Sequence, residues 1–148
     1  MRSRIQAVVL PSEVSDFSDE LRRIFLELGR AYGSGALAGE CSPALDVFEH
    51  DDAIEVVVDL PGVDIAAVRV VAKGDALLIA GEKPSRRGGL ESTFHLVERG
   101  FGRFARAVRL GRPVDPAKAR ATLVNGELRV TVPKIADRRG QSIEIRVS

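Results

Sequence analysis

Apolar positions along the chain change their period near residue 43. Within 16–31, apolar residues recur at i, i+4, i+7, i+8 and i+11, which predicts one amphipathic helix. Since a single amphipathic helix cannot bury its own stripe, we expect it either to pack on its own domain or to serve as an arm for assembly or client capture. A glycine-rich segment at 33–42 is typical of a flexible linker. The stripe comprises Phe17, Leu21, Ile24, Phe25 and Leu28.

From Pro43 onward the apolar residues alternate with a period of two, which predicts β-strands. Turn signals separate them: Asp51-Asp52, Gly74-Asp75 and Asn125-Gly126. Seven or eight short strands at this spacing favour an antiparallel β-sandwich. The strands are expected at 44–50, 53–60, 68–74, 76–82, 92–98, 102–110, 119–124 and 127–132.

The final residues carry an isolated apolar pair. Ile143 and Ile145 flank Glu144, and in an extended segment both side chains point to the same side. They could fill two pockets on an exposed strand edge while the backbone adds hydrogen bonds. Alternation alone equally fits a final strand of the same sandwich. Three parts are therefore expected: an arm with linker at 1–42, a domain at 43–134 and an extension at 135–148.

Composition restricts the class of protein. Of 148 residues, 45% are hydrophobic and 29% charged, which indicates a globular chain. A single cysteine, Cys41, excludes an internal disulfide framework and favours the reducing cytosol. We find no signal-peptide pattern and no apolar run near the ~20 residues of a membrane span. The net charge of +1 predicts neither nucleic-acid nor membrane partners.

Charge is distributed unevenly along the predicted domain. Acidic residues dominate 44–81, and basic residues dominate 82–148. This pattern fits two solvated faces, or complementary surfaces that help copies of the chain associate.

Residues for catalysis are scarce. The histidines are His50 and His95, and no pair of His or Cys residues has zinc-ligand spacing. Cys41 lies in the predicted linker without a neighbouring group to activate it. We also find no phosphate-binding loop. The sequence therefore predicts a protein that is not an enzyme and has no cofactor or metal.

Three segments together resemble the signatures of the α-crystallin domain of small heat-shock proteins. They are "DLPGVDIAAVRVVAKGDALLIAGEK", "ERGFGRFARAVRL" and "ATLVNGELRVTVPK", and they occur in the family's order and spacing over roughly 43–147. The resemblance implies an immunoglobulin-like β-sandwich that forms homodimers and then larger homo-oligomers. It also implies an ATP-independent holdase that binds unfolding client proteins. An alternative is a co-chaperone adaptor of the same fold, although such adaptors lack the paired-isoleucine tail.

The resemblance also assigns roles to residues. The tail pair Ile143 and Ile145 is the implied anchor, and its receiving groove is lined by Val68, Val70, Ala119, Ala121 and Leu123, which ordinary core packing would explain equally well. The segment 92–98 is expected to pair with 44–49 of a second subunit, and Arg106 either bonds near that interface or is a surface arginine. The helical stripe is the implied client-binding and assembly arm. The dimer residues are Leu45, Val47, Phe94, Leu96, Val97, Glu98 and Arg106.

Overall fold

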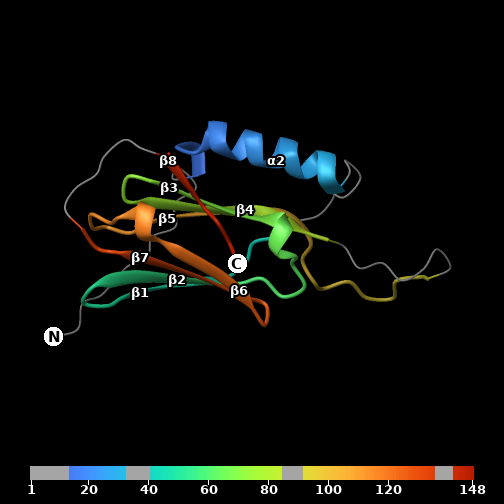
Figure 1. Ribbon diagram of the computed structural model, residues 1–148. Coiled ribbons are helices and arrows are strands. Elements are labelled where there is room, and N and C mark those ends of the chain that lie inside the picture. The colour runs from blue at the N-terminus through green and yellow to red at the C-terminus, as the bar shows by residue number, and fades with distance from the viewer. Residues whose placement is uncertain (1–13, 33–40, 85–91, 136–141) are drawn as a thin grey trace.

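The computed structural model describes residues 14–32, 41–84, 92–135 and 142–148. Two four-stranded antiparallel sheets pack face to face, and one helix lies on the outer face of the second sheet (Figure 1). The expected all-β sandwich with a helical arm is thus confirmed. No helix within these described ranges is long and apolar enough to cross a membrane.

Each sheet has two edge strands, which are the first and the last strand in its order. The first sheet has the order β1-β2-β7-β6, and the second has the order β5-β4-β3-β8. The elements are α2 (Ser18–Tyr32), β1 (Leu45–Glu49), β2 (Ala53–Asp59), β3 (Val68–Lys73), β4 (Ala76–Lys83), β5 (Gly102–Arg109), β6 (Arg120–Val124), β7 (Glu127–Pro133) and β8 (Ser142–Ile145), with short 3-10 turns η2 (Ile65–Ala67) and η3 (Pro116–Lys118).

The expected hairpin turns form where the sequence places them. Asn125 and Gly126 have φ values of 55° and 77°, and they join β6 to β7. Both values lie in the left-handed region that a two-residue hairpin turn requires, which explains the Asn-Gly pair. Gly74, with φ of 61°, makes the corresponding turn between β3 and β4.

The main core fills the space between the sheets. Alternate residues of each strand point inward, as the period of two requires. Ile54, Val56 and Val58 of β2 meet Leu128, Val130 and Val132 of β7, and Leu77 and Ile79 of β4 close the core from the second sheet.

Strand β4 is buried on both faces, so the second sheet needs a cover. Leu78 and Ala80 of β4 point away from the main core, together with Val71 of β3 and Ala107 of β5. Helix α2 lies over them and forms a second apolar cluster. The cluster contains Phe17, Ile24, Leu28, Val71, Leu78, Ala80 and Ala107, with Val14, Leu21, Phe25, Ala76 and Ala105 at its margin.

The expected strand at 92–98 is wrong for the single chain. The segment has no regular secondary structure, and its side chains are exposed. The reason is physical: a strand needs a neighbour for its backbone hydrogen bonds, and this segment leaves the body of the sandwich (Figure 1). The eighth strand is instead formed by the tail, as β8.

Gly81 gives the first testable prediction. A methyl group at Gly81 would lie 2.2 Å from the Ala67 carbonyl oxygen and 2.8 Å from Cζ of Phe104. Gly81→Ala should therefore lower the free energy of unfolding by about 1–3 kcal/mol in urea titrations. Gly29→Ala adds the same methyl with 3.6 Å to the nearest Arg103 atom, and it should not destabilise the protein. Equal stability of Gly81→Ala and wild type would contradict the packing at β4.

Candidate functional site

The tail occupies a groove at one side of the sandwich. Strand β8 pairs antiparallel with β3, so that Ile145 lies opposite Val70 and Ile143 lies opposite Ala72. Ile145 is only 5% exposed and belongs to the main core, whereas Ile143 is half-buried. The tail therefore extends the second sheet and inserts one isoleucine between the two sheets.

The other wall of the groove is strand β6 of the first sheet. Val147 makes a parallel bridge with Ala121. The Ser148 backbone N–H donates to the Ala121 carbonyl at 2.9 Å, and the Leu123 N–H donates to the Ser148 carbonyl at 2.9 Å. The last seven residues thus connect β3 of one sheet to β6 of the other.

The residues that the resemblance assigned to a receiving groove lie near this tail within the same chain, and their role as a groove for another copy stays a prediction. Val68, Val70 and Ala121 are buried beside the tail, and Ala119 and Leu123 are partly buried on the same core. The sequence reasoning missed Ala72 and Val147, although both continue the i, i+2 series of residues that were named.

The groove filled here belongs to the same chain as the tail. The expectation that the tail docks into a neighbouring copy therefore stays a prediction. Burial of Ile145 contributes roughly 1.5–3 kcal/mol, and ordering the tail offsets part of this gain. The ion pair from Arg69 to Glu144, at 3.6 Å, is substantially exposed and adds little. A contact of this strength is reversible.

The opposite side of the sandwich holds edge strands β1 and β5. Arg106 of β5 connects the two sheets there, because its Nη1 donates to the carbonyl of Pro43, just before β1. Burial lowers the pKa of Arg106. The structure thus brings Arg106 to the start of the expected dimer strand, where it bonds within its own chain rather than lying free on the surface.

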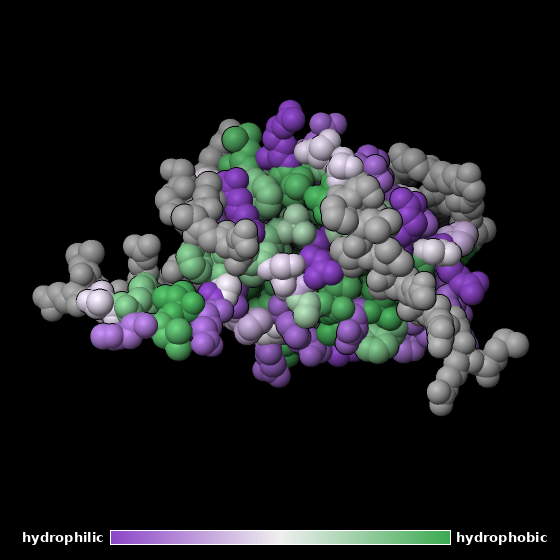
Figure 2. Space-filling model, turned by 180° about the vertical axis from the view of Figure 1, so that it is seen from behind, coloured by the Kyte–Doolittle hydropathy of each residue, from purple (hydrophilic) through white to green (hydrophobic). Residues whose placement is uncertain are grey.

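The expected dimer residues fall into two groups. Phe94, Leu96 and Val97 are 56%, 75% and 55% exposed, and Glu98 is exposed beside them. Figure 2 shows their segment projecting from the body as an apolar cluster with polar side chains around it. Exposed apolar clusters of this kind mark sites of protein association.

The other group lies on β1. Leu45 and Val47 direct their side chains toward the chain's own core, so neither presents a free apolar surface. What β1 offers a partner is its backbone, since it is the outer strand of its sheet, and the 47% exposed Phe48 on its outer face.

The apolar stripe of the helical region, which the sequence suggested for client binding, is covered by the second sheet. Phe17, Ile24 and Leu28 are almost fully buried against β3, β4 and β5, while Leu21 and Phe25 lie at the margin. Lys73 donates to Glu20 at 3.5 Å at one end of the helix. In the structure the stripe packs on the chain's own domain, and its role as a client-binding arm stays a prediction.

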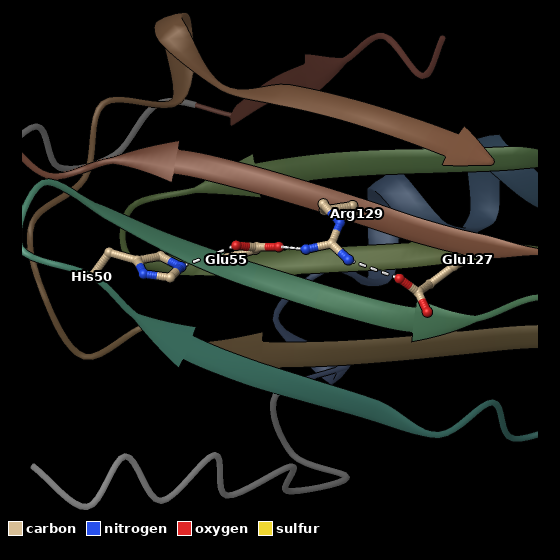
Figure 3. Close-up of polar contacts among 4 residues, drawn as sticks. All are labelled: His50, Glu55, Glu127 and Arg129. Carbon is tan, nitrogen blue, oxygen red and sulfur yellow. Dashed lines mark hydrogen bonds and ion pairs between the residues drawn. The ribbon is translucent and has the colours of Figure 1, made fainter. Parts of the chain in front are cut away.

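A row of polar side chains lies on the outer face of the first sheet (Figure 3). His50 Nε2 lies 3.0 Å from Oε2 of Glu55, and Glu55 accepts a second bond from Arg129. Arg129 also donates to Glu127 at 2.8 Å. The hydrogen bond from His50, together with the Arg129 guanidinium, lowers the pKa of the Glu55 carboxyl. This row links β2 to β7 on the outer face of the sheet and gives His50 a carboxylate partner.

Comparison with known proteins agrees with this geometry. Residues 46–148 match the model of the Hsp20/alpha crystallin family. The chain belongs to this family. It shares 35% identity over 106 residues with the spore protein SP21 of Stigmatella aurantiaca, covering 72% of this chain and 63% of that protein.

Solved structures of small heat-shock proteins have the same fold. Heat shock protein 16.0 of Schizosaccharomyces pombe aligns with a TM-score of 0.62 and 35% identity, over 69% of this chain and 94% of that one. A small heat-shock protein of Xylella fastidiosa, described as having a distinct high order structure, aligns with a TM-score of 0.57 and 28% identity, over 70% and 94% of the two chains. Membership of this family is consistent with a chaperone role.

Acid titration tests the polar row. Since the pKa of Glu55 is lowered in the folded protein, its contribution to stability is present above the ordinary pKa of 4.5 and is lost as the pH falls through the lowered value. Urea titrations between pH 6 and 3 should show a smaller acid-induced loss of stability for Glu55→Gln than for wild type. Asp46→Asn, at an exposed carboxylate of β1, should follow wild type. Matching acid profiles of Glu55→Gln and wild type would contradict the assignment.

Proposed function

We propose that this protein is an ATP-independent holdase, which binds unfolding proteins through apolar surface and prevents their aggregation. The observation that carries the proposal is the cover on the second sheet: one amphipathic helix conceals an apolar face that β3, β4 and β5 present outward. When the helix lifts, two apolar surfaces become available together, the stripe of α2 and the sheet face beneath it. Both could bind the apolar segments of a client.

The ion pairs that hold helix α2 on the second sheet are weak. The Lys73–Glu20 pair is long, and Arg109 pairs with Asp16 at 3.8 Å on the surface. The exposed Arg109–Asp16 pair contributes about 0–1 kcal/mol. The helix is therefore held mainly by apolar contact, the same interaction that a client would offer.

We propose that the stored form is an oligomer of dimers. In the dimer, the segment 92–98 of one chain adds to the free edge of β1 in the other, which provides the hydrogen-bond partner that this segment lacks in a single chain. In the oligomer, Ile143 and Ile145 dock between β3 and β6 of a neighbouring copy. Many weak tails become strong together, because each later contact is intramolecular. The single cysteine, Cys41, fits a reducing compartment, and we propose the cytosol.

Light scattering tests the holdase directly. A heat-unfolding enzyme, mixed with the protein at comparable mass and without ATP, should show strongly reduced turbidity. Ovalbumin at the same mass serves as a control for crowding. If turbidity rises as in the control, the holdase proposal is wrong.

The tail provides the second test of the proposal. Ile143 and Ile145 changed together to Gly remove the apolar anchors and should shift the protein to smaller assemblies in size-exclusion chromatography with light scattering. Ser142→Gly, on the exposed face of the same strand, is the matched control and should keep the wild-type mass. An unchanged mass for the double variant would remove the anchor role.

A further inference from the structure

A buried carboxylate lies beneath helix α2. Glu82 of β4 is 2% exposed, and among the residues that the structure describes neither of its carboxylate oxygens has a hydrogen-bond partner. It alternates with Leu78 and Ala80, so it faces the helix rather than the main core. An unpaired buried carboxylate is costly, which makes this position a source of stored free energy.

The nearest cation is held by the helix instead. Arg103 lies opposite Glu82 in the β4–β5 register, but its guanidinium lies 4.7 Å from the centre of the Phe25 ring. Its Nη2 also approaches the Phe25 carbonyl at 3.4 Å, and Gly29 of the next helical turn leaves room for it. The Nε of Arg103 is buried and has no partner. Arg103 thus contacts the helix, and Glu82 stays unpaired.

We propose that Arg103 and Glu82 form a latch that controls the lifting of helix α2. With the helix docked, Arg103 contacts Phe25 and acts on Glu82 only through its charge, without a hydrogen bond to the carboxylate. With the helix lifted, Arg103 is free to pair with Glu82, and water reaches both groups. When the helix lifts, Arg103 exchanges Phe25 for Glu82. The new ion pair offsets part of the free energy that is lost with the apolar contacts. The inference rests on the proposed holdase, because it assigns the control of that same surface.

Other charged groups near this position have partners of their own. Arg69 of β3 is on the same sheet face, but its guanidinium donates to the carbonyls of Ala66 and Val68. Glu20 of α2 pairs with Lys73. The η2 turn packs on β4 with uncharged Ala67 against Gly81, the residue before Glu82. Arg103 is therefore the cation that acts on Glu82.

The latch gives docking a defined dependence on pH. Burial raises the pKa of Glu82 in the docked state, although the charge of Arg103 opposes this. Docking therefore favours the protonated carboxyl. As pH rises from the ordinary pKa of 4.5 through the raised pKa, the equilibrium constant for docking falls by up to about tenfold per pH unit. Above the raised pKa it levels off.

Hydrogen exchange of the full-length protein measures docking through the amides of Leu21–Gly29, after correction for intrinsic rates. Wild type should lose protection as pH rises from 4.5 to 8. Glu82→Gln keeps the shape and removes the charge, so it should exchange more slowly than wild type at pH 7.5 and show a flat profile. Glu27→Gln, at an exposed position of α2, should behave as wild type. Arg103→Lys keeps the charge but not the planar contact with Phe25, and it should loosen the helix across the pH range.

Amides of β2 and β7 report in the same experiment whether each variant is folded. A pH-independent wild-type profile, or equal protection of α2 in wild type and Glu82→Gln, would overturn the latch. If Glu82→Gln does not fold, the pH profile of wild type and the protection of α2 in Arg103→Lys still test the latch. The readout contains no client, so it is separate from the turbidity assay: a wild type that suppresses aggregation without this pH response would contradict the latch alone.

Discussion

The insertion of Ile145 between two sheets is the contact on which the account of this protein depends. The sandwich has a gap between β3 and β6, and the chain does not close it with a loop of the domain itself. A short terminal segment closes it, with backbone hydrogen bonds along β3 and at Ala121, and with one well-buried side chain. The groove meets the tail through backbone hydrogen bonds and one buried isoleucine, which are the contacts that the proposed docking of another copy's tail would reproduce.

Helix α2 also covers apolar surface, on the larger outer face of the second sheet. The second sheet is apolar on both sides, because β4 is buried along nearly its whole length. A sheet of this kind must be covered, and α2 covers it with an apolar stripe. Helix α2 forms a cluster separate from the main core, whereas the tail places Ile145 within that core. Two segments outside the first seven strands thus cover apolar surface of the sandwich.

Sequence patterns predicted the local structure well, for identifiable reasons. Asn125-Gly126 and Gly74 require positive φ values, so the hairpins followed directly from residue type. The alternation in β2 and β7 fixed which side chains point inward. The stripe of α2 fixed its buried face but not the surface beneath it. The continuous apolar run of β4 was the available signal for that surface, since a strand buried on both faces needs a second layer.

Long-range pairing could not be predicted in the same way. The alternation of 92–98 indicated a strand, but a strand exists only with a neighbour, and this chain alone does not supply one. Glu82 and Arg103 are separated by 20 intervening residues, and neither the burial of the carboxylate nor the approach of Arg103 to Phe25 has a signature in sequence. Periodicity likewise leaves open which copy's groove accepts Ile145.

A disulfide bridge across the groove would settle that last question most directly. Ala72 and Ile143 lie opposite each other in the β3–β8 pair, close enough to bridge when both are changed to Cys in a Cys41→Ser background. After mild oxidation, a non-reducing gel should show bands of two or more chains that collapse to one on reduction. Chains bridged only internally, or not bridged at all, would contradict the docking of tails into neighbouring copies.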